Sequence, residues 1–248
     1  MIANYIHKQI LDHQEIEWQF EAADLERVEG WLEQHRSISG LSVISGAIRE
    51  LNDTYYDTED WRLYHAGCIL RVRRDGEGVE ATMKSLAPAE GALRRRREIS
   101  VPLRSGGTEL LEKVHDPVGE RLRRLAGDRD LRPLFEVRTR RRPFALHLAK
   151  PSEKNAAVGE VVLDESEFSG AARAPIRQCR VEVEVDSDAE LHEGIVEFVD
   201  GLRDALNLRP TRTSKFETGL SAAGLSPPRV PNLDPKERSE RSGRRDGR

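Results

Sequence analysis

The feature that most constrains the fold of this chain is a set of strand-like segments in which charged and apolar residues alternate. In "RVEVEVD", valines alternate with Glu182 and Glu184, so a strand would place both acids on one face. Near the start, "QEIEWQF" repeats the pattern with Glu15 and Glu17. Like charges side by side on a strand are destabilising, so both pairs require an explanation.

Other segments of the same kind carry basic residues. By the same rule, the side chains that share a face are Arg71 with Arg73, Arg94 with Arg96 and Glu98, Arg138 with Arg140, and Glu160 with Asp164. Acids gather on the first and the late segments, and arginines gather on the middle ones. A sheet face exposed to water would mix the signs more freely and would carry more Thr, Ser and Gln.

Two folds can explain this pattern. The ordinary one is a half-exposed sheet with its polar face in water. The other is a closed antiparallel barrel with the charged face inward and helices covering the apolar face. An eight-stranded barrel is just wide enough for side chains and one small ligand. We therefore predict an α+β fold built on a closed eight-stranded antiparallel β-barrel, or tunnel, with surrounding helices.

A charged interior indicates the kind of ligand that the barrel would hold. Buried charges need partners, which can be each other or a ligand. Arginines and lysines favour a polyanion with several oxygens, such as a polyphosphate. Clustered carboxylates favour a hard divalent cation, Mg²⁺ or Mn²⁺. The pattern is thus typical of phosphoryl-transfer chemistry.

Length and composition favour a single soluble domain. The chain has 248 residues, of which 34% are charged, and a net charge of -4 that does not indicate a nucleic-acid binder. We predict one domain over residues 1–225 and a disordered polar tail over 226–248. Cys68 and Cys179 lack metal-binding spacing, so no disulfide framework is expected. Without a secretory segment or a long apolar stretch, we expect a cytoplasmic protein that does not bind membranes.

Helical periodicity is clearest in two segments. In 24–36, Leu25, Val28 and Leu32 form one stripe, and Asp24 is a candidate N-cap. The segment 189–207 gives the strongest helix prediction. Residues 107–127 also have helical character, although Pro117 divides them.

The order of the motifs resembles the CYTH domain, the triphosphate tunnel metalloenzyme superfamily. "EIEWQ" resembles its opening ExExK signature, and "YYDTED" followed by "GCILRVRR" resembles its second block. "TMK", "RRREIS", "VRTRR", "VVLDE" and "RVEVEVD" follow in the family's order, and "SKFETG" resembles the closing SKxxRG. The likeness runs from about residue 14 to residue 220. It is greatest to the bacterial inorganic triphosphatase type.

The resemblance implies a tunnel fold that hydrolyses inorganic triphosphate or thiamine triphosphate, or cyclises ATP, with Mg²⁺ or Mn²⁺. It implies catalytic roles for Glu15, Glu17, Glu182 and Glu184, and metal binding by these four together with Asp164. It implies that the phosphate oxygens are bound by Arg71, Arg73, Lys84, Arg96, Arg138, Arg140 and Lys215. Whether Arg140 or Arg141 points inward depends on a possible bulge, and Glu98 and Glu160 would orient the basic residues.

Two positions depart from the family motifs. Gln19 stands at the signature lysine position, and Thr218 stands at the arginine position of SKxxRG. Gln19 can donate hydrogen bonds but carries no charge. These departures leave open whether the protein turns over its substrate.

Other functions remain open at this stage. One is an adenylyl cyclase on the same fold, which would need a pocket for adenine. Another is a non-catalytic protein that binds triphosphate, polyphosphate or a nucleotide. For any of these functions we expect a monomer or a homodimer. The third is nucleic-acid binding through the run 94–97 and the basic tail, which would depend steeply on salt. Strand alternation buries half of that run, so we do not expect nucleic acid as a partner.

Overall fold

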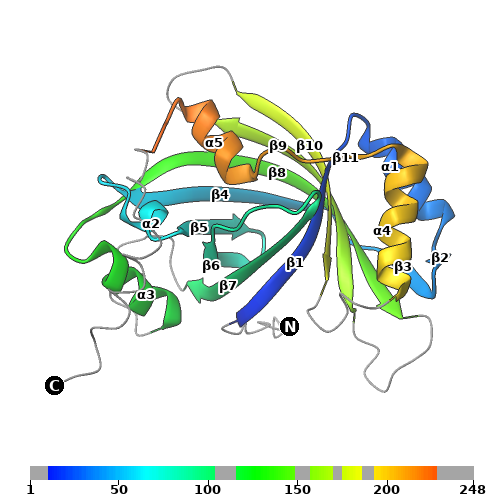
Figure 1. Cartoon of the computed structure of the whole chain (residues 1–248), viewed down its shortest axis with the longest axis horizontal. Helices are drawn as coiled ribbons and strands as arrows, with labels where there is room; N and C mark the ends of the chain where they lie inside the picture. Colours follow the sequence, from blue (N-terminus) through cyan, green and yellow to red (C-terminus); the bar gives the residue numbers. More distant parts are fainter. Residues whose placement is uncertain (1–10, 104–115, 149–156, 170–174, 186–192, 228–248) are drawn as a thin grey trace, which may run out of the picture.

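A computed structural model of the chain describes residues 11–103, 116–148, 157–169, 175–185 and 193–227 (Figure 1). Its centre is a closed barrel of eight antiparallel strands in the order β8-β4-β5-β6-β7-β1-β10-β9, with β9 pairing back onto β8. The prediction of a closed eight-stranded antiparallel barrel is therefore confirmed. The strands of the barrel are β1 (Leu11–Glu21), β4 (Arg49–Thr58), β5 (Cys68–Asp75), β6 (Gly78–Ser85), β7 (Leu93–Leu103), β8 (Leu131–Leu148), β9 (Gly159–Ser169) and β10 (Ile176–Val185).

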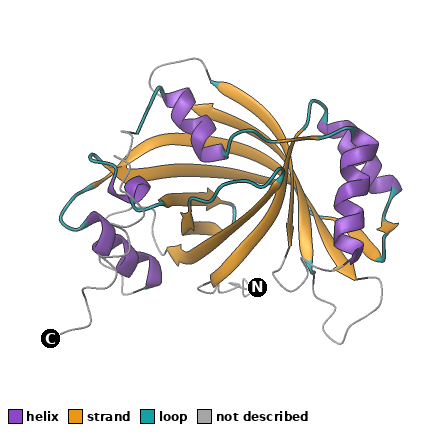
Figure 2. Cartoon of the chain, in the orientation of Figure 1, coloured by secondary structure: helices purple, strands orange, loops and turns teal. Residues whose placement is uncertain are grey.

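Short strands and helices surround the barrel (Figure 2). The long strand β8 continues beyond the barrel and pairs with β3 (Leu41–Ser45), which pairs with β2 (Ser37–Ile38). A two-residue strand, β11 (Arg209–Pro210), pairs with β1. The helices are α1 (Leu25–Gln34), α2 (Arg62–His65), α3 (Pro117–Ala126), α4 (Glu193–Leu206) and α5 (Lys215–Ala223).

The predicted helices occur where their caps and periodicity place them. Asp24 caps α1 by accepting a hydrogen bond from the backbone nitrogen of Arg27 at 3.1 Å. In the 107–127 region the helix begins at Pro117 after the N-cap Asp116, and residues 104–115 lie outside the described part. Proline at the first helical position explains why the sequence pattern was divided there.

The outward faces of the strands are apolar, and helices cover them on two sides. Around α1 and α4, Leu32 and Phe198 belong to one core cluster with Ile16, Val161 and Val183. Helix α3 covers β5 to β7 on the opposite side, and its Val118 and Leu122 belong to a second cluster. Figure 1 shows α1 and α4 on one side of the barrel and α3 on the other. Where helices cover the barrel, the apolar residues of the alternating strands therefore face those helices.

A third apolar cluster occupies part of the interior itself. Tyr55, Phe135 and Phe168 lie on the inward faces of β4, β8 and β9, and Phe216 of α5 packs among them. The rings of Tyr55 and Phe135 stack with centroids 4.7 Å apart. The barrel interior is therefore apolar where α5 packs and charged elsewhere, which the sequence pattern did not predict.

Three further predictions concern the C-terminal tail, the cysteines and membrane-spanning helices. The predicted tail, 226–248, lies outside the described part except for its first two residues. Cys68 and Cys179 are both free thiols. Among the described residues, no helix combines the length and apolar character that a membrane span requires.

Candidate functional site

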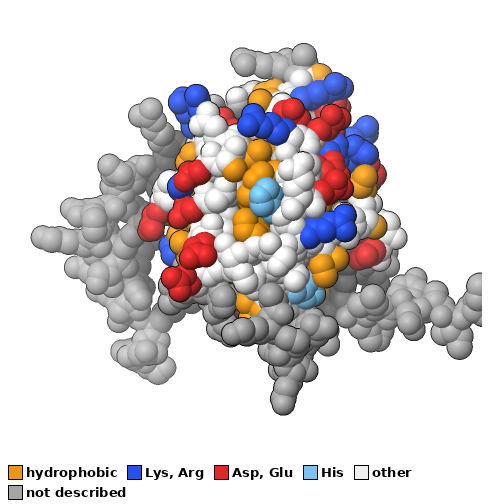
Figure 3. All heavy atoms as spheres, turned by 90° about the vertical axis from the view of Figure 1, so that its right-hand side faces the viewer, with side chains coloured by type: hydrophobic (Ala, Val, Ile, Leu, Met, Phe, Trp, Pro, Cys, Tyr) orange, Lys and Arg blue, Asp and Glu red, His pale blue; other side chains and the backbone are white. Residues whose placement is uncertain are grey.

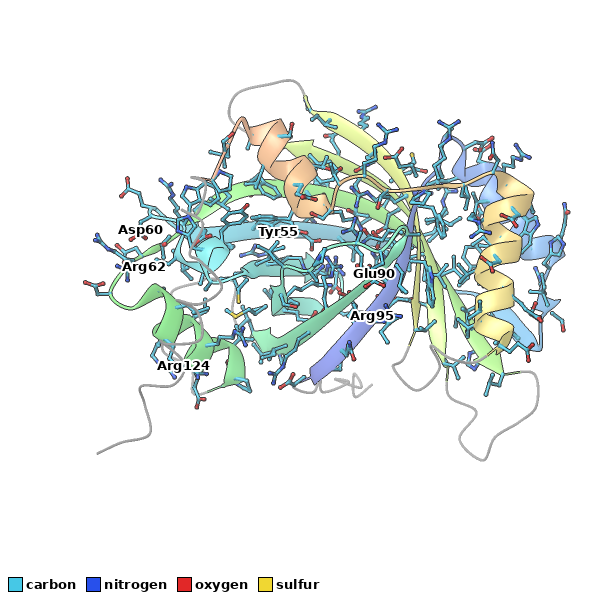
Figure 4. All side chains as sticks on the ribbon, in the orientation of Figure 1. Tyr55, Asp60, Arg62, Glu90, Arg95 and Arg124 are labelled. Atoms are coloured by element: carbon cyan, nitrogen blue, oxygen red, sulfur yellow. The ribbon has the colours of Figure 1, made fainter. Side chains whose placement is uncertain are left out.

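A charged cavity of about 350 Å³ lies inside the barrel. All eight barrel strands contribute to its wall, and Lys215 and Phe216 of α5 complete it. Its acidic residues include Glu15, Glu17, Glu98, Glu160, Glu182 and Glu184, and its basic residues are Arg49, Arg71, Arg73, Lys84, Arg96, Arg141 and Lys215. Figure 4 shows side chains that carry nitrogen and side chains that carry oxygen between the strands near Tyr55, which also lines the cavity. The inward charge predicted from strand alternation is present.

The acids of β1 and β10 meet side by side in this wall. Glu17 lies directly opposite Glu184 in the antiparallel pairing, and Gln19 lies opposite Glu182. Glu15 pairs with Lys84 at 2.6 Å and with Arg96 at 3.2 Å, and Arg96 also contacts Glu17. Glu184 has no ion pair or hydrogen bond within the described chain. The repulsion is therefore offset by cations for Glu15 and Glu17, but not for Glu184.

This arrangement shifts the pKa values of the carboxyl groups in the wall in different directions. Burial and the charges of Glu15 and Glu17 raise the pKa of Glu184 to about 8. Burial also raises the pKa of Glu17. In contrast, although burial opposes it, the charges of Lys84 and Arg96 lower the pKa of Glu15. The environment of Glu184 thus favours either a proton or an added cation.

The carboxylates fit a divalent cation in their chemistry. Oxygen donors are the ligands that Mg²⁺ and Mn²⁺ prefer, and Glu15, Glu17 and Glu184 supply them from neighbouring positions. Within the described ranges, no three His, Cys, Asp or Glu side chains already have the arrangement of a metal site. Lys84 and Arg96 contact the oxygens of Glu15 and Glu17 instead. A cation would therefore bind there in exchange for basic side chains.

A second charged cluster joins β8, β9 and α5. Arg141 donates two hydrogen bonds to Asp164, at 2.6 and 2.8 Å, and Lys215 lies 2.5 Å from the same carboxylate. Both cations also reach Glu182, at 3.3 and 3.1 Å. Asp164 is fully buried and does not line the cavity, and its carboxylate orients the two cations. Its expected role as a metal ligand stays a prediction.

Asp53 of β4 is a site residue that sequence analysis missed. Its carboxylate accepts two hydrogen bonds from Arg73, at 2.7 and 2.8 Å, and lies 3.9 Å from Arg71. Burial opposes ionisation, but the charges of Arg73 and Arg71 hold the pKa of Asp53 well below its usual range. Its strand neighbours on the same face are Leu51 and Tyr55, so no charged alternation marked it.

Arg138 and Arg140 lie outside the tunnel, contrary to expectation. Both are exposed, whereas Arg141 is buried and lines the cavity. The pairings set this orientation, because Arg141 lies opposite the inward-facing Asp164. Arg138 and Arg140 border a shallow groove on the outer face instead, near acidic residues of β9. The inward arginine of this strand is therefore Arg141.

Gln19 holds the position where the motif has lysine, and it is buried. Its amide nitrogen donates to Glu182 at 3.3 Å, and its amide oxygen accepts from Nε of Arg94 at 2.8 Å. The other departure, Thr218, accepts a hydrogen bond from Arg180 at 3.3 Å. Arg94 was predicted to face inward without an assigned role, and Arg180 was not singled out.

Comparison with known proteins agrees with this geometry. No curated protein matches the chain. Among solved structures, a candidate adenylyl cyclase from Hippeastrum, HpAC1, described as revealing a dominant triphosphatase activity, has a TM-score of 0.58 at 13% identity and covers 86% of this chain and 98% of its own. A candidate adenylate cyclase from Bacillus halodurans has a TM-score of 0.52 at 19% identity, with 84% and 97% covered.

A third structure, protein PH1819 from Pyrococcus horikoshii, has a TM-score of 0.51 at 18% identity and covers 84% of this chain and 98% of its own. Likenesses at this identity establish the fold alone. The family model of the CYTH domain matches residues 13–216, which include every strand of the barrel except the first two residues of β1. With its inward-facing acids and bases in the motif order, the chain belongs to the CYTH domain family.

Proposed function

We propose that the protein hydrolyses a triphosphate inside the barrel, inorganic triphosphate being the best fit, with Mg²⁺ or Mn²⁺ bound. The observation that carries this proposal is the cavity of about 350 Å³, whose basic side chains converge from β4 to β8 and from α5. Inorganic triphosphate is a compact polyanion that needs many donors and no apolar slot. The named activity of the Hippeastrum relative, triphosphatase, supports the same class of reaction.

The basic side chains would hold the substrate by its phosphate oxygens. Each arginine offers a planar fork that matches two oxygens of a phosphate, and each lysine offers a compact charge. Asp53, Glu98 and Asp164 keep these cations in place before substrate arrives, through ion pairs of 2.5 to 2.7 Å. The residues proposed to bind phosphate are Arg71, Arg73, Lys84, Arg96, Arg141 and Lys215.

The acids proposed to hold the divalent cation are Glu15, Glu17 and Glu184, with Glu182 beside them. When bound there, such a cation neutralises phosphate charge and lowers the pKa of a water molecule. Substrate oxygens can take the donors of Lys84 and Arg96, which leaves the oxygens of Glu15 and Glu17 available. Gln19, Arg141 and Lys215 fix the orientation of Glu182.

The test is phosphate release from inorganic triphosphate, with ATP and thiamine triphosphate in parallel, in Mg²⁺ and in Mn²⁺. We expect metal-dependent release that is greatest for inorganic triphosphate. Replacing both metal-binding acids, Glu15→Gln/Glu17→Gln, should lower the rate at least ~100-fold, because metal affinity is lost. The exposed Glu33→Gln on α1 is the matched control and should keep the full rate. Equal rates in the double variant and the wild type would refute the assignment.

Gln19 and Thr218 favour one alternative, a tunnel that binds triphosphate without hydrolysing it. Metal-dependent binding of triphosphate with no phosphate release from any of the three substrates would establish it.

An adenylyl cyclase would require a slot for a base. The apolar side of the cavity offers Tyr55 and Phe216, which are only 6% and 4% exposed. These rings therefore leave little room for a base. Formation of cyclic AMP in the ATP reaction would contradict this conclusion and would favour the cyclase.

The described residues do not favour nucleic-acid binding through the run 94–97. In the run 94–97, Arg94 and Arg96 face the interior, and the outward Arg95 and Arg97 pair with Glu90 at 3.5 Å and Asp12 at 2.8 Å. Glu90 and Arg95 lie close together in Figure 4. The face shown in Figure 3 mixes acidic and basic side chains around a strip of apolar and histidine side chains.

A further inference from the structure

Two arginines beside the cavity differ from all the basic residues of its wall. Arg94 of β7 and Arg180 of β10 are 6% and 0% exposed, and neither forms an ion pair within the described residues. Every basic residue of the wall, in contrast, has a carboxylate oxygen within 4.0 Å: Arg49, Arg71, Arg73, Lys84, Arg96, Arg141 and Lys215. The charges of Arg94 and Arg180 are therefore buried without a carboxylate partner among the described residues.

The contacts of Arg94 and Arg180 are with neutral groups. Arg94 donates to the amide oxygen of Gln19 at 2.8 Å and to the hydroxyl of Thr211 at 3.5 Å. Arg180 uses one nitrogen, Nη2, for the hydroxyl of Thr218 at 3.3 Å and for two other neutral oxygens at 2.8 Å. Its Nε and Nη1 are buried and have no hydrogen-bond partner among the described residues. Arg180 therefore has unused donors as well as an unbalanced charge.

Such charges are costly for the free protein. A guanidinium does not lose its proton in a protein, so burial cannot remove its charge. Burial lowers the pKa of both arginines. The charge of Arg96 adds to the effect on Arg94, and the charge of Glu182 opposes the effect on Arg180 only in part. A buried cation without a partner is destabilising unless an anion comes near it. The position of the pair indicates which anion that is.

Both arginines adjoin the cavity through residues of the family motifs. Gln19 lines the cavity and contacts Arg94, and Thr218 lies on α5 one turn beyond Lys215, which also lines it. Gln19 and Thr218 are also the two positions where the motif cations are missing. We infer that Arg94 and Arg180 supply this missing charge from β7 and β10, and that a phosphate group of the bound triphosphate balances it. The inference rests on the proposed function.

The contact between Gln19 and Arg94 explains why glutamine occupies its position. A lysine there would bring its ammonium against the guanidinium of Arg94, which lies 2.8 Å from the glutamine oxygen. The amide instead accepts from Arg94 on one side and donates to Glu182 on the other. Arg94 on β7 thus provides the cation that a lysine at position 19 of β1 would otherwise provide. Exchanging the two residues should preserve the total charge and the affinity for phosphate.

The experiment measures binding of the non-hydrolysable imidotriphosphate in Mg²⁺ by calorimetry. We expect Arg94→Gln and Arg180→Gln each to weaken binding about tenfold or more, as charged interactions of this kind do. Gln19→Lys alone should also weaken binding, and Gln19→Lys/Arg94→Gln should return to within about threefold of the wild type. Arg95→Gln, on the outward face of the same strand, is the control and should bind normally.

A stability measurement separates this role from a structural one. If the charge of Arg94 serves the ligand, Arg94→Gln should keep or raise the melting temperature of the free protein while it loses affinity. Unchanged affinity in both arginine variants, or a double variant no better than Gln19→Lys, would overturn the inference. If the wild type itself neither binds nor hydrolyses triphosphate, the proposed function fails as well. Normal wild-type binding with unaffected variants refutes only the role of the two arginines.

Discussion

Glu184 is a wall glutamate that has no cationic partner among the described residues, and its protonation should contribute to the pH dependence of the metal-free protein. Its pKa in the folded protein is about 8, compared with the ordinary 4.5 that applies to the unfolded chain. A group whose pKa is raised by folding stabilises the fold at low pH and loses that contribution as pH rises through its folded pKa. Ionising Glu184 therefore destabilises the protein above neutral pH.

We expect the free energy of unfolding, measured with urea in EDTA, to fall by about 2–4 kcal/mol more in the wild type than in Glu184→Gln between pH 5.5 and 8.5. The amide cannot ionise, so the variant lacks this part of the dependence. Adding Mg²⁺ at pH 8.5 should restore stability to the wild type and have less effect on the variant. Parallel pH profiles of the two proteins would contradict the assignment.

At the residue scale, strand alternation predicted the inward positions where an inward neighbour two residues away was also charged. Glu15, Glu17, Arg71 and Arg73 all line the cavity. It failed on β8 because the inward residues there are Phe135, Val137 and Thr139 before Arg141. Charge marked the wrong face of that strand, since its inward residues belong to the apolar part of the interior. Asp53 was missed for the same reason, because its inward neighbours are apolar.

At the scale of elements, helix α5 depends on a glycine for its position against the barrel. A Cβ added to Gly219 would overlap the ring of Phe135. The same helix carries Lys215, which pairs with Asp164 at 2.5 Å. Close packing at Gly219 therefore sets where Lys215 meets the cavity.

We expect Gly219→Ala to destabilise the protein by about 1–3 kcal/mol, because overpacking outweighs the higher helix propensity of alanine. The rate of triphosphate hydrolysis should fall by more than the loss of folded protein explains, because Lys215 is displaced. Gly201→Ala on α4 is the matched control: its Cβ meets nothing within 4 Å, and it should stabilise by about 0.5–1 kcal/mol. Urea unfolding and triphosphate hydrolysis measure the two effects, and a neutral Gly219→Ala would show that α5 can shift freely.

A second element, the short helix α2, is held by one buried carboxylate of the "YYDT" segment. Asp57 accepts hydrogen bonds from the backbone nitrogens of Thr58, Leu63 and Tyr64 at 2.7 to 2.9 Å. A four-residue helix has little stability of its own, because most of its backbone groups lack helical partners. The sequence motif at this point therefore has a structural role on the wall of the tunnel.

Removal of that carboxylate, Asp57→Ala, should cost about 2–4 kcal/mol of unfolding free energy, since three buried donors lose their acceptor. Asp60→Ala is the control, because Asp60 is exposed and bonds mainly to the nearby side chains of Thr58 and Arg62. Figure 4 shows Asp60 and Arg62 together at the outer end of this segment. The control should keep nearly all of its unfolding free energy, because exposed ion pairs contribute little to stability. Equal losses in the two variants would remove the special role of Asp57.

At the scale of the whole molecule, the closed barrel was predictable because a charged sheet face without water needs an enclosed interior and outward helices. The segments that pair with each other were predictable only where a short connection joins consecutive strands, as between β5 and β6 and between β6 and β7. The pairings of β1 with β7 and β10 and of β4 with β8, and the packing of α5 onto the interior, join segments far apart in the sequence, so no local pattern records them. The cavity is thus limited by elements that sequence periodicity could not place.

The enclosed charges also couple the two proposed ligands. In the free protein, Arg96 and Lys84 neutralise Glu15 and Glu17, so a divalent cation and a polyphosphate each disrupt the same ion pairs. Once one ligand has separated the pairs, the other binds without that cost. Linkage requires the two effects to be equal, so each ligand should raise the affinity for the other by the same factor.

We expect imidotriphosphate to tighten Mg²⁺ binding by about 5–50-fold in the wild type, which is within the usual range of such coupling. Arg96→Gln should bind Mg²⁺ more tightly on its own, because Glu17 is freed, and should show weaker coupling. Calorimetric titrations in both orders measure the factor, and association of Mg²⁺ with the analogue in solution is the same for both proteins. Identical coupling in the two proteins would mean that the ion pairs of the free tunnel do not link its two ligands.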